Sequence, residues 1–360
     1  TLELQTLTSR PVGSWGGYDK LDYLETLAKN SYARVVLSAL GFETSSSWAS
    51  TKLDILNQVF DKGGNLVLKD VDERLETACR RLHICGKNLI QIISGDASTL
   101  VSLRTTLVNL SIASNKYVSS FPFEAKGALT SVGFPVLTAI EKQPSGTAIF
   151  FSTPKYKKIK TPCQVTRNGK VETIMLDEEV VTHVYEVVFV PNDSDRIELR
   201  ISAETLKRDV ETSLDRLREA FYDILRTSGV SLTSFKIVML EKGIINLYNE
   251  AGYGKVIDTK FISVKNRTIM PRTVKRKVDI CLRDQPYHKA GEKVEAVTCV
   301  GVIIQFRART TKKNLLVTTR LGLECDPHSD YKTCNHLILE NPIGNKKAIE
   351  FIDHLIDSNV

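Results

Sequence analysis

Short apolar runs alternate with helically spaced apolar residues along the first 110 positions of the chain. Runs such as 34–40 and 89–93 are continuous, which is typical of strands that are buried on both faces. The predicted strands are 34–40, 66–69 and 89–93, and the predicted helices are 18–30, 53–60, 70–85 and 100–110. Because strands alternate with helices, we predict a Rossmann-like α/β domain over residues 1–125, with a small parallel sheet flanked by helices.

The pattern changes after this segment. Prolines and glycines recur over 126–180, where only 146–152 clearly reads as a strand, so a connector with one or two strands is predicted there. Further along the chain, the predicted strands are 184–190, 196–202, 235–240, 244–248, 255–264, 277–283, 293–297 and 303–307, and the predicted helices are 203–228 and 346–358. This order predicts an α+β domain over 181–360 with a mostly antiparallel sheet.

Composition places the chain among ordinary globular proteins. Of its 360 residues, 42% are hydrophobic and 25% are charged, and no apolar run approaches the roughly 20 residues that span a bilayer. The opening residues show no secretory-signal pattern. Seven scattered cysteines, mostly among apolar neighbours, favour reduced thiols over a disulfide framework. These features predict a cytoplasmic or nuclear protein that does not enter a membrane.

Positive charge is concentrated in one segment. Residues 261–313 carry thirteen Lys and Arg against four Asp and Glu, whereas the whole chain carries 49 against 42. A basic antiparallel sheet favours a polyanionic partner, so DNA or RNA bound through its phosphates is the predicted ligand. The predicted phosphate contacts are Lys155, Lys157, Lys158, Lys160, Lys265, Arg267, Arg272, Lys275, Arg276, Lys277, Arg307, Arg309, Lys312 and Lys313. Two alternatives are a solvated outer sheet face and a surface for an acidic protein partner.

Acidic residues follow the predicted strands of the first domain. Glu43, Asp70, Asp72 and Asp96 would meet at the carboxyl edge of a parallel sheet, where they could hold Mg²⁺ for a nuclease or phosphodiesterase. The same loops could instead bind a nucleotide phosphate, or Ser, Thr and Asp there could simply cap the helices that follow. Neither a G-x-G-x-x-G nor a G-x-x-x-x-G-K-[ST] pattern is present.

Two further motifs suggest chemistry. Asp258 and Lys260 form an acid-x-Lys strand like that of restriction-type nucleases. Cys325, His328, Cys334 and His336 lie within twelve residues and could supply a tetrahedral Zn²⁺ site, although the spacing matches no usual zinc finger. The alternative for these four residues is a loop with two buried thiols and two exposed imidazoles.

The sequence therefore predicts a nucleic-acid-binding protein whose basic antiparallel sheet contacts the phosphate backbone. In this interpretation, the Rossmann-like domain is an interaction or nucleotide-sensing module. The alternatives are a metal-dependent nuclease or phosphodiesterase, and a subunit without catalytic activity that docks an acidic protein.

Overall fold

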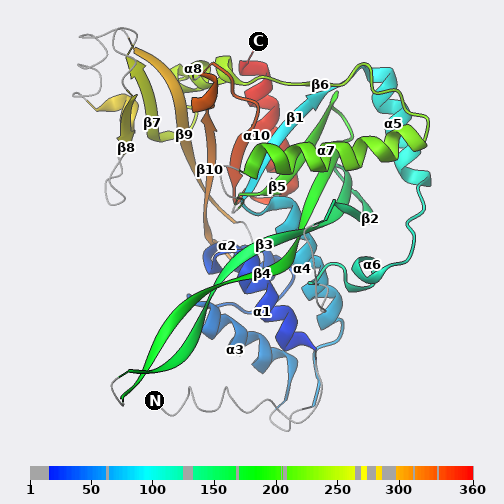
Figure 1. The fold of residues 1–360 in the computed structure, drawn as a ribbon, viewed down its shortest axis with the longest axis vertical. Helices are drawn as coiled ribbons and strands as arrows, with labels where there is room; N and C mark the ends of the chain where they lie inside the picture. Colours follow the sequence, from blue (N-terminus) through cyan, green and yellow to red (C-terminus); the bar gives the residue numbers. More distant parts are fainter. Residues whose placement is uncertain are drawn as a thin grey trace. The chain divides into compact units, whose positions relative to one another are not determined.

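In the computed structural model, the chain forms two compact units. Figure 1 labels the helices and strands of the chain. Unit 1 comprises Thr1–Asn88 with Leu240–Val360, and unit 2 comprises Leu89–Met239. The structure describes residues 16–61, 65–124, 133–167, 170–203, 205, 209–263, 269–273, 281–285, 297–310, 313–330 and 332–359. The predicted ranges 1–125, 126–180 and 181–360 divide the chain at other residues.

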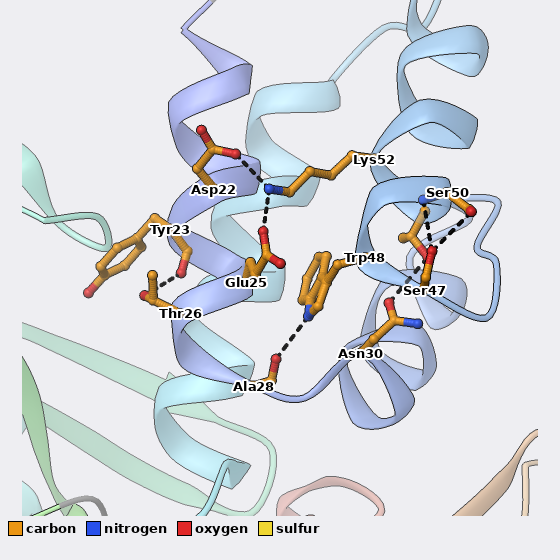
Figure 2. Close-up of polar contacts among 11 residues, drawn as sticks. Asp22, Tyr23, Glu25, Thr26, Ala28, Asn30, Ser47, Trp48, Ser50 and Lys52 are labelled. Atoms are coloured by element: carbon orange, nitrogen blue, oxygen red, sulfur yellow. Dashed lines mark hydrogen bonds and ion pairs between the residues drawn. The ribbon is translucent and has the colours of Figure 1, made fainter. Parts of the chain in front are cut away.

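The N-terminal part of unit 1 is helical. Its helices are α1 (Gly17–Leu27), α2 (Asn30–Ala39), α3 (Trp48–Val59) and α4 (Val71–Cys85). Figure 2 shows Lys52 of α3 between Asp22 and Glu25 of α1, with Nζ 2.6 Å from the Asp22 carboxylate. The indole N–H of Trp48 donates to the Ala28 carbonyl at 3.1 Å, which ties the start of α3 to the end of α1.

The predicted strand at 34–40 is wrong, because this segment belongs to helix α2. Tyr32, Ala33, Val36 and Leu37 are buried, a spacing that forms one stripe along a helix. A short apolar run does not by itself distinguish a strand from a buried helix, and here the helical stripe decides. The predicted strand at 66–69 is also absent, apart from one isolated bridge between Phe60 and Leu66.

The C-terminal part of unit 1 contains an antiparallel sheet. The strand order is β11-β10-β9-β7-β8, with β7 (Lys255–Ser263), β8 (Ile269–Thr273), β9 (Val297–Arg309), β10 (Leu316–Glu324) and β11 (Leu337–Glu340). Two helices, α8 (Glu241–Asn249) and α10 (Gly344–Ser358), and two short turns, η2 (Leu282–Asp284) and η3 (Pro327–Ser329), complete it. The predicted strand at 244–248 is helix α8, because Ile244, Leu247 and Tyr248 are buried at helical spacing.

Unit 2 contains the other strands of the sheet. Its strand order is β2-β3-β4-β5-β1, with β2 (Val136–Gln143), β3 (Gly146–Arg167), β4 (Lys170–Pro191), β5 (Arg196–Ser202), β1 (Asn88–Ser94) and a short β6 (Lys236–Ile237) beside β1. Its helices are α5 (Ala97–Asn109), α6 (Lys116–Ser120) and α7 (Val210–Thr227). Helix α7 packs against β5 through an apolar stripe that includes Leu214, Leu217 and Phe221. The segment predicted to be a connector, 126–180, thus supplies β2, β3 and the first half of β4.

The Rossmann-like prediction is therefore wrong. Within the described residues, the structure contains no small parallel sheet flanked by helices, because two of its three predicted strands do not form. The third, β1, joins a mostly antiparallel sheet instead. The chain is an α/β protein whose N-terminal part is helical and whose sheet is mostly antiparallel.

Candidate nucleic-acid interface

The sheet of unit 1 has two different faces. Along β9, Val302 and Ile304 are buried on one face. On the other face, Gln305 is half-buried and Arg307 is exposed. Helices α8 and α10 pack on the apolar face, where the rings of Phe306 and Phe351 lie 4.5 Å apart. The opposite face, here called the outer face, carries the polar positions of β7, β9, β10 and β11.

Strand register gathers cations at one end of the outer face. Residues directly opposite each other in an antiparallel pair share a face. Three rows of facing residues run across the strands there. The first row is Lys255, Gln305, Arg320 and Glu340, the second is Arg307 and Thr318, and the third is Arg309 and Leu316. We call the group Lys255, Gln305, Arg307, Arg309, Thr318 and Arg320 the basic end.

The basic end has a clear excess of positive charge. Arg307 and Arg309 are exposed, and the Arg309 guanidinium donates to the Asn314 carbonyl at 3.3 Å, close to the β9–β10 turn. Arg320 approaches Glu340 at 3.5 Å, and the same carboxylate also receives Lys87 at 2.9 Å. Among the described residues of these rows, Glu340 is the acidic side chain, so cations outnumber it.

A depression of about 370 Å³ lies at the corner of the basic end. It is lined by Gly254, Lys255, Gln305, Phe306 and Arg307. Gly254 has a φ of +62°, and a Cβ there would lie 2.4 Å from Ile304 and 2.6 Å from the Phe306 ring. The chain therefore requires glycine at this position to enter β7 so close to β9.

Arg283 holds the connection between α8 and β7 that borders this depression. Its guanidinium donates to the carbonyls of Leu247, Tyr248, Tyr253 and Gly254, at 2.9, 2.6, 3.2 and 3.4 Å. The C-terminal carbonyls of a helix lack partners within the helix, so the guanidinium satisfies groups that would otherwise need water. Arg283 thus positions Lys255 without being part of the outer face.

The predicted phosphate contacts are only partly brought together. Arg307 and Arg309 lie in the basic end, and the Lys313 ammonium donates to the Phe42 carbonyl at 3.2 Å. Lys265, Arg267, Lys275, Arg276, Lys277 and Lys312 lie outside the described residues, and Arg272 is described only as a backbone position of β8. Lys255, Gln305, Thr318 and Arg320 are not among the predicted contacts. The signal that could have indicated them is their alternation with buried residues along β7, β9 and β10.

The cations at 155–160 belong to unit 2. Lys155 pairs with the buried Glu186 at 2.5 Å, and exposed Lys160 lies opposite Asp177 in the register of β3 and β4. Lys157 and Lys158 are described only as backbone positions, opposite Val180 and Glu179. The acidic residues 177–179 of β4 therefore lie opposite the last part of this basic segment, 158–160.

Asp258 and Lys260 lie on the outer face, beyond the basic end. Thr259 between them is buried, so the two flanking side chains share the opposite side of β7. Lys260 is hydrogen bonded to Glu324 on the same face. In the described part of the chain, no group of three or more His, Cys, Asp or Glu side chains could hold a metal ion.

The four acidic residues of the predicted magnesium site are not joined by a sheet edge. Glu43 is exposed in a loop, Asp70 precedes α4 with a φ of +58°, and Asp72 pairs with Lys20 at 2.7 Å. Asp96 lies in unit 2 and caps α5 by accepting from the Thr99 amide at 2.7 Å. Hydrogen bonds from Ser98, Ser234 and Thr99 hold the pKa of the Asp96 carboxyl well below its ordinary value. Asp96 thus caps a helix, which was the alternative to a magnesium or phosphate site.

The predicted zinc ligands do not form a cluster among the described residues. Burial raises the pKa of Cys325 to about 11 and that of Cys334 to about 12, so both are thiols at neutral pH. His328 is exposed on η3, and His336 bonds through Nδ1 to the Asn335 amide oxygen at 2.8 Å. The zinc site stays a prediction that this geometry does not favour.

No protein-family model, curated protein or solved structure matches this chain. In the described residues, no helix is both long enough and apolar enough to cross a membrane.

Proposed function

We propose that the protein binds nucleic acid through the basic end, by contacts to the phosphate backbone. The observation that carries the proposal is the strand register that places Lys255, Arg307, Arg309 and Arg320 on one face of a single sheet. Phosphate binding requires several cations arranged along a surface, since each neutralised phosphate releases condensed counterions.

The spacing of the basic end suits a polyanion. Side chains two residues apart on a strand are roughly 7 Å apart, and those on neighbouring strands roughly 5 Å apart. Arg307 and Arg309 are long and exposed, so they can reach successive phosphates of one strand. Gln305 and Thr318 beside them offer neutral donors, which contact phosphate oxygens without reading a base sequence. Binding should thus tolerate many sequences.

Removing the two exposed arginines tests this proposal. We expect Arg307→Gln/Arg309→Gln to weaken binding of labelled DNA and RNA about equally for all sequences. The slope of log affinity against log salt should fall by roughly 2, because about two phosphate contacts are lost. Fluorescence anisotropy in two or more salt concentrations measures both quantities.

The matched control removes two cations elsewhere. Arg226 and Lys347 lie on helices α7 and α10, with side chains 51% and 49% exposed. Arg226→Gln/Lys347→Gln therefore changes the net charge equally, and we expect its salt slope to match that of the unmodified protein. Equal losses in both double variants would mean that only net charge matters. Weak binding without salt dependence in the unmodified protein would also contradict the proposal.

A metal-dependent nuclease is the second candidate function. It is favoured by the position of Asp258 and Lys260 on the same outer face as the basic end. If it is correct, labelled DNA or RNA should be cut in the presence of Mg²⁺ or Mn²⁺, and Asp258→Ala should abolish cutting while preserving binding in EDTA. Intact substrate with every metal tested would reject this candidate and leave the binding proposal unaffected.

A further inference from the structure

Strands β3 and β4 of unit 2 extend far beyond their neighbours in the sheet. Strand β2 pairs with β3 over 146–152, and β5 pairs with β4 over 187–189. The outer residues 155–167 and 170–182 are paired with each other, and we call this two-stranded ribbon the arm. Figure 1 shows β3 and β4 continuing past β2 and β5 as a long twisted ribbon. A two-stranded ribbon is marginally stable alone in water, so an arm of this length needs a covering surface.

One face of the arm is apolar at several exposed positions. The register pairs Tyr156 with Val181 and Pro162 with Met175, which places these residues on the same face. Tyr156, Met175 and Val171 on this face are 64, 55 and 65% exposed. These three side chains are spread along one face, whereas the exposed Leu176 lies on the other face. Exposed large apolar side chains on one face favour an interaction there.

The same face has a basic strand beside an acidic strand. On this face Lys160 of β3 lies opposite Asp177 of β4, whereas Lys158 is described only as a backbone position, opposite Glu179. A phosphate backbone would meet the acidic strand as well as the basic one, so this face does not favour nucleic acid. A partner must instead offer both signs of charge in the same arrangement.

A second copy of this chain offers that arrangement. When one arm is turned about a two-fold axis parallel to its length and laid on another, face to face, β3 of each copy lies over β4 of the other. Lys160 then lies over Asp177 of the second copy, and the same contact forms twice because the interface is isologous. Tyr156 and Met175 become covered in both copies. We propose that this face of the arm is the surface through which two copies of the chain associate.

The size of the arm predicts a weak dimer. The thirteen residues in each strand of the arm span roughly 40 Å, and a two-stranded ribbon is about 10 Å wide. A face of that size falls below the area that stable interfaces bury, so we expect dissociation in the micromolar range. The proposal is independent of nucleic-acid binding by the basic end, which lies in unit 1.

Charge reversal at the central pair tests the proposal. The full chain is followed by analytical ultracentrifugation between about 1 and 200 µM, a range chosen for a weak interface. We expect Lys160→Glu alone and Asp177→Lys alone each to weaken dimerisation roughly tenfold or more, because like charges then face each other across the interface. An equimolar mixture of the two variants should dimerise again, since every facing pair in the heterodimer is of opposite sign.

The mixture also distinguishes a lost interface from a misfolded arm, because an unfolded variant cannot be restored by another. The double variant Lys160→Glu/Asp177→Lys should dimerise like the unmodified chain. The control Arg226→Glu, on the exposed side of α7, should leave dimerisation unchanged. An unmodified chain that stays monomeric over the whole range would overturn the proposal, as would a mixture that stays monomeric. Loss of DNA binding in Lys160→Glu would then assign the arm to nucleic acid.

Discussion

Replacing Glu198 by Gln is expected to destabilise unit 2 by roughly 3 to 5 kcal/mol, the cost of breaking a buried ion pair. Glu198 lies fully buried between Arg196 and Arg200 on β5. Its two oxygens receive Arg196 Nε at 2.8 Å and Arg200 Nε at 3.0 Å. Because residues two apart on a strand share a face, all three charges point to one side of β5. Without the carboxylate, two buried guanidinium groups would lie side by side.

The protonation state of Glu198 gives this effect a pH dependence. Burial by itself would raise the pKa of the Glu198 carboxyl, but Arg200 and Arg196 outweigh burial and hold the pKa below its ordinary value of 4.5. A carboxyl with a depressed folded-state pKa stabilises the fold above the ordinary value and loses that contribution as the pH falls. The difference in the free energy of unfolding between the unmodified protein and Glu198→Gln should therefore become smaller as the pH falls below about 4.5.

Hydrogen exchange can follow each unit separately. In Glu198→Gln, the amides of β4 and β5 should lose protection, whereas those of β9 and β10 in unit 1 should change little. Glu219→Gln on α7 is the matched control, because that side chain is 55% exposed and pairs only at the surface. Replacing all three charged residues by apolar ones should recover much of the stability, since buried ion networks often give no net gain over apolar packing. Unchanged protection in Glu198→Gln would contradict this account.

Replacing Arg283 by Met should destabilise unit 1 by roughly 2 to 4 kcal/mol, because hydrogen bonds from a charged group to several carbonyls are lost together. The carbonyls concerned belong to Leu247, Tyr248, Tyr253 and Gly254, where α8 leads into β7. Thermal unfolding and hydrogen exchange over 241–263 measure the effect.

The variant Arg283→Lys separates charge from geometry. Lysine keeps the positive charge, but its compact ammonium cannot span carbonyls that a planar guanidinium reaches together. We therefore expect Arg283→Lys to remain destabilised and to bind nucleic acid more weakly, since Lys255 loses its support. Arg226→Lys, at an exposed position of α7, serves as control and should change neither property. Full stability in Arg283→Lys would show that charge alone is sufficient.

Local patterns in the sequence predicted many elements correctly. Helices α4, α7 and α10 each carry an apolar stripe within one short segment, and the apolar run at 89–93 forms β1. The turn residues between β4 and β5 likewise indicated that these two strands pair in an antiparallel way, as they do. Such elements are encoded within one short window, so a single sequence is enough to find them.

The prediction of a parallel sheet is wrong because it depended on a short apolar run, the pattern that distinguishes strands from helices least well. The run at 34–40 suits a buried strand or a buried helix equally, and the packing of Tyr32 and Val36 decided for a helix. Without that strand, the edge of a parallel sheet on which Glu43 and Asp96 were predicted to lie does not form. A site predicted from a fold requires every element that brings its residues together, and here one of those elements, the strand at 34–40, is a helix.

The sequence by itself determined the alternation of β9 and β10 and the concentration of positive charge around them. Only the tertiary structure decided which cations act together, because helices α8 and α10 cover one face and the register aligns Lys255, Arg307 and Arg320 on the other. It also decided which cations are neutralised, since Lys155 and Lys260 meet Glu186 and Glu324 from distant parts of the chain. Charge pairing depends on distance in space, which a linear pattern does not contain.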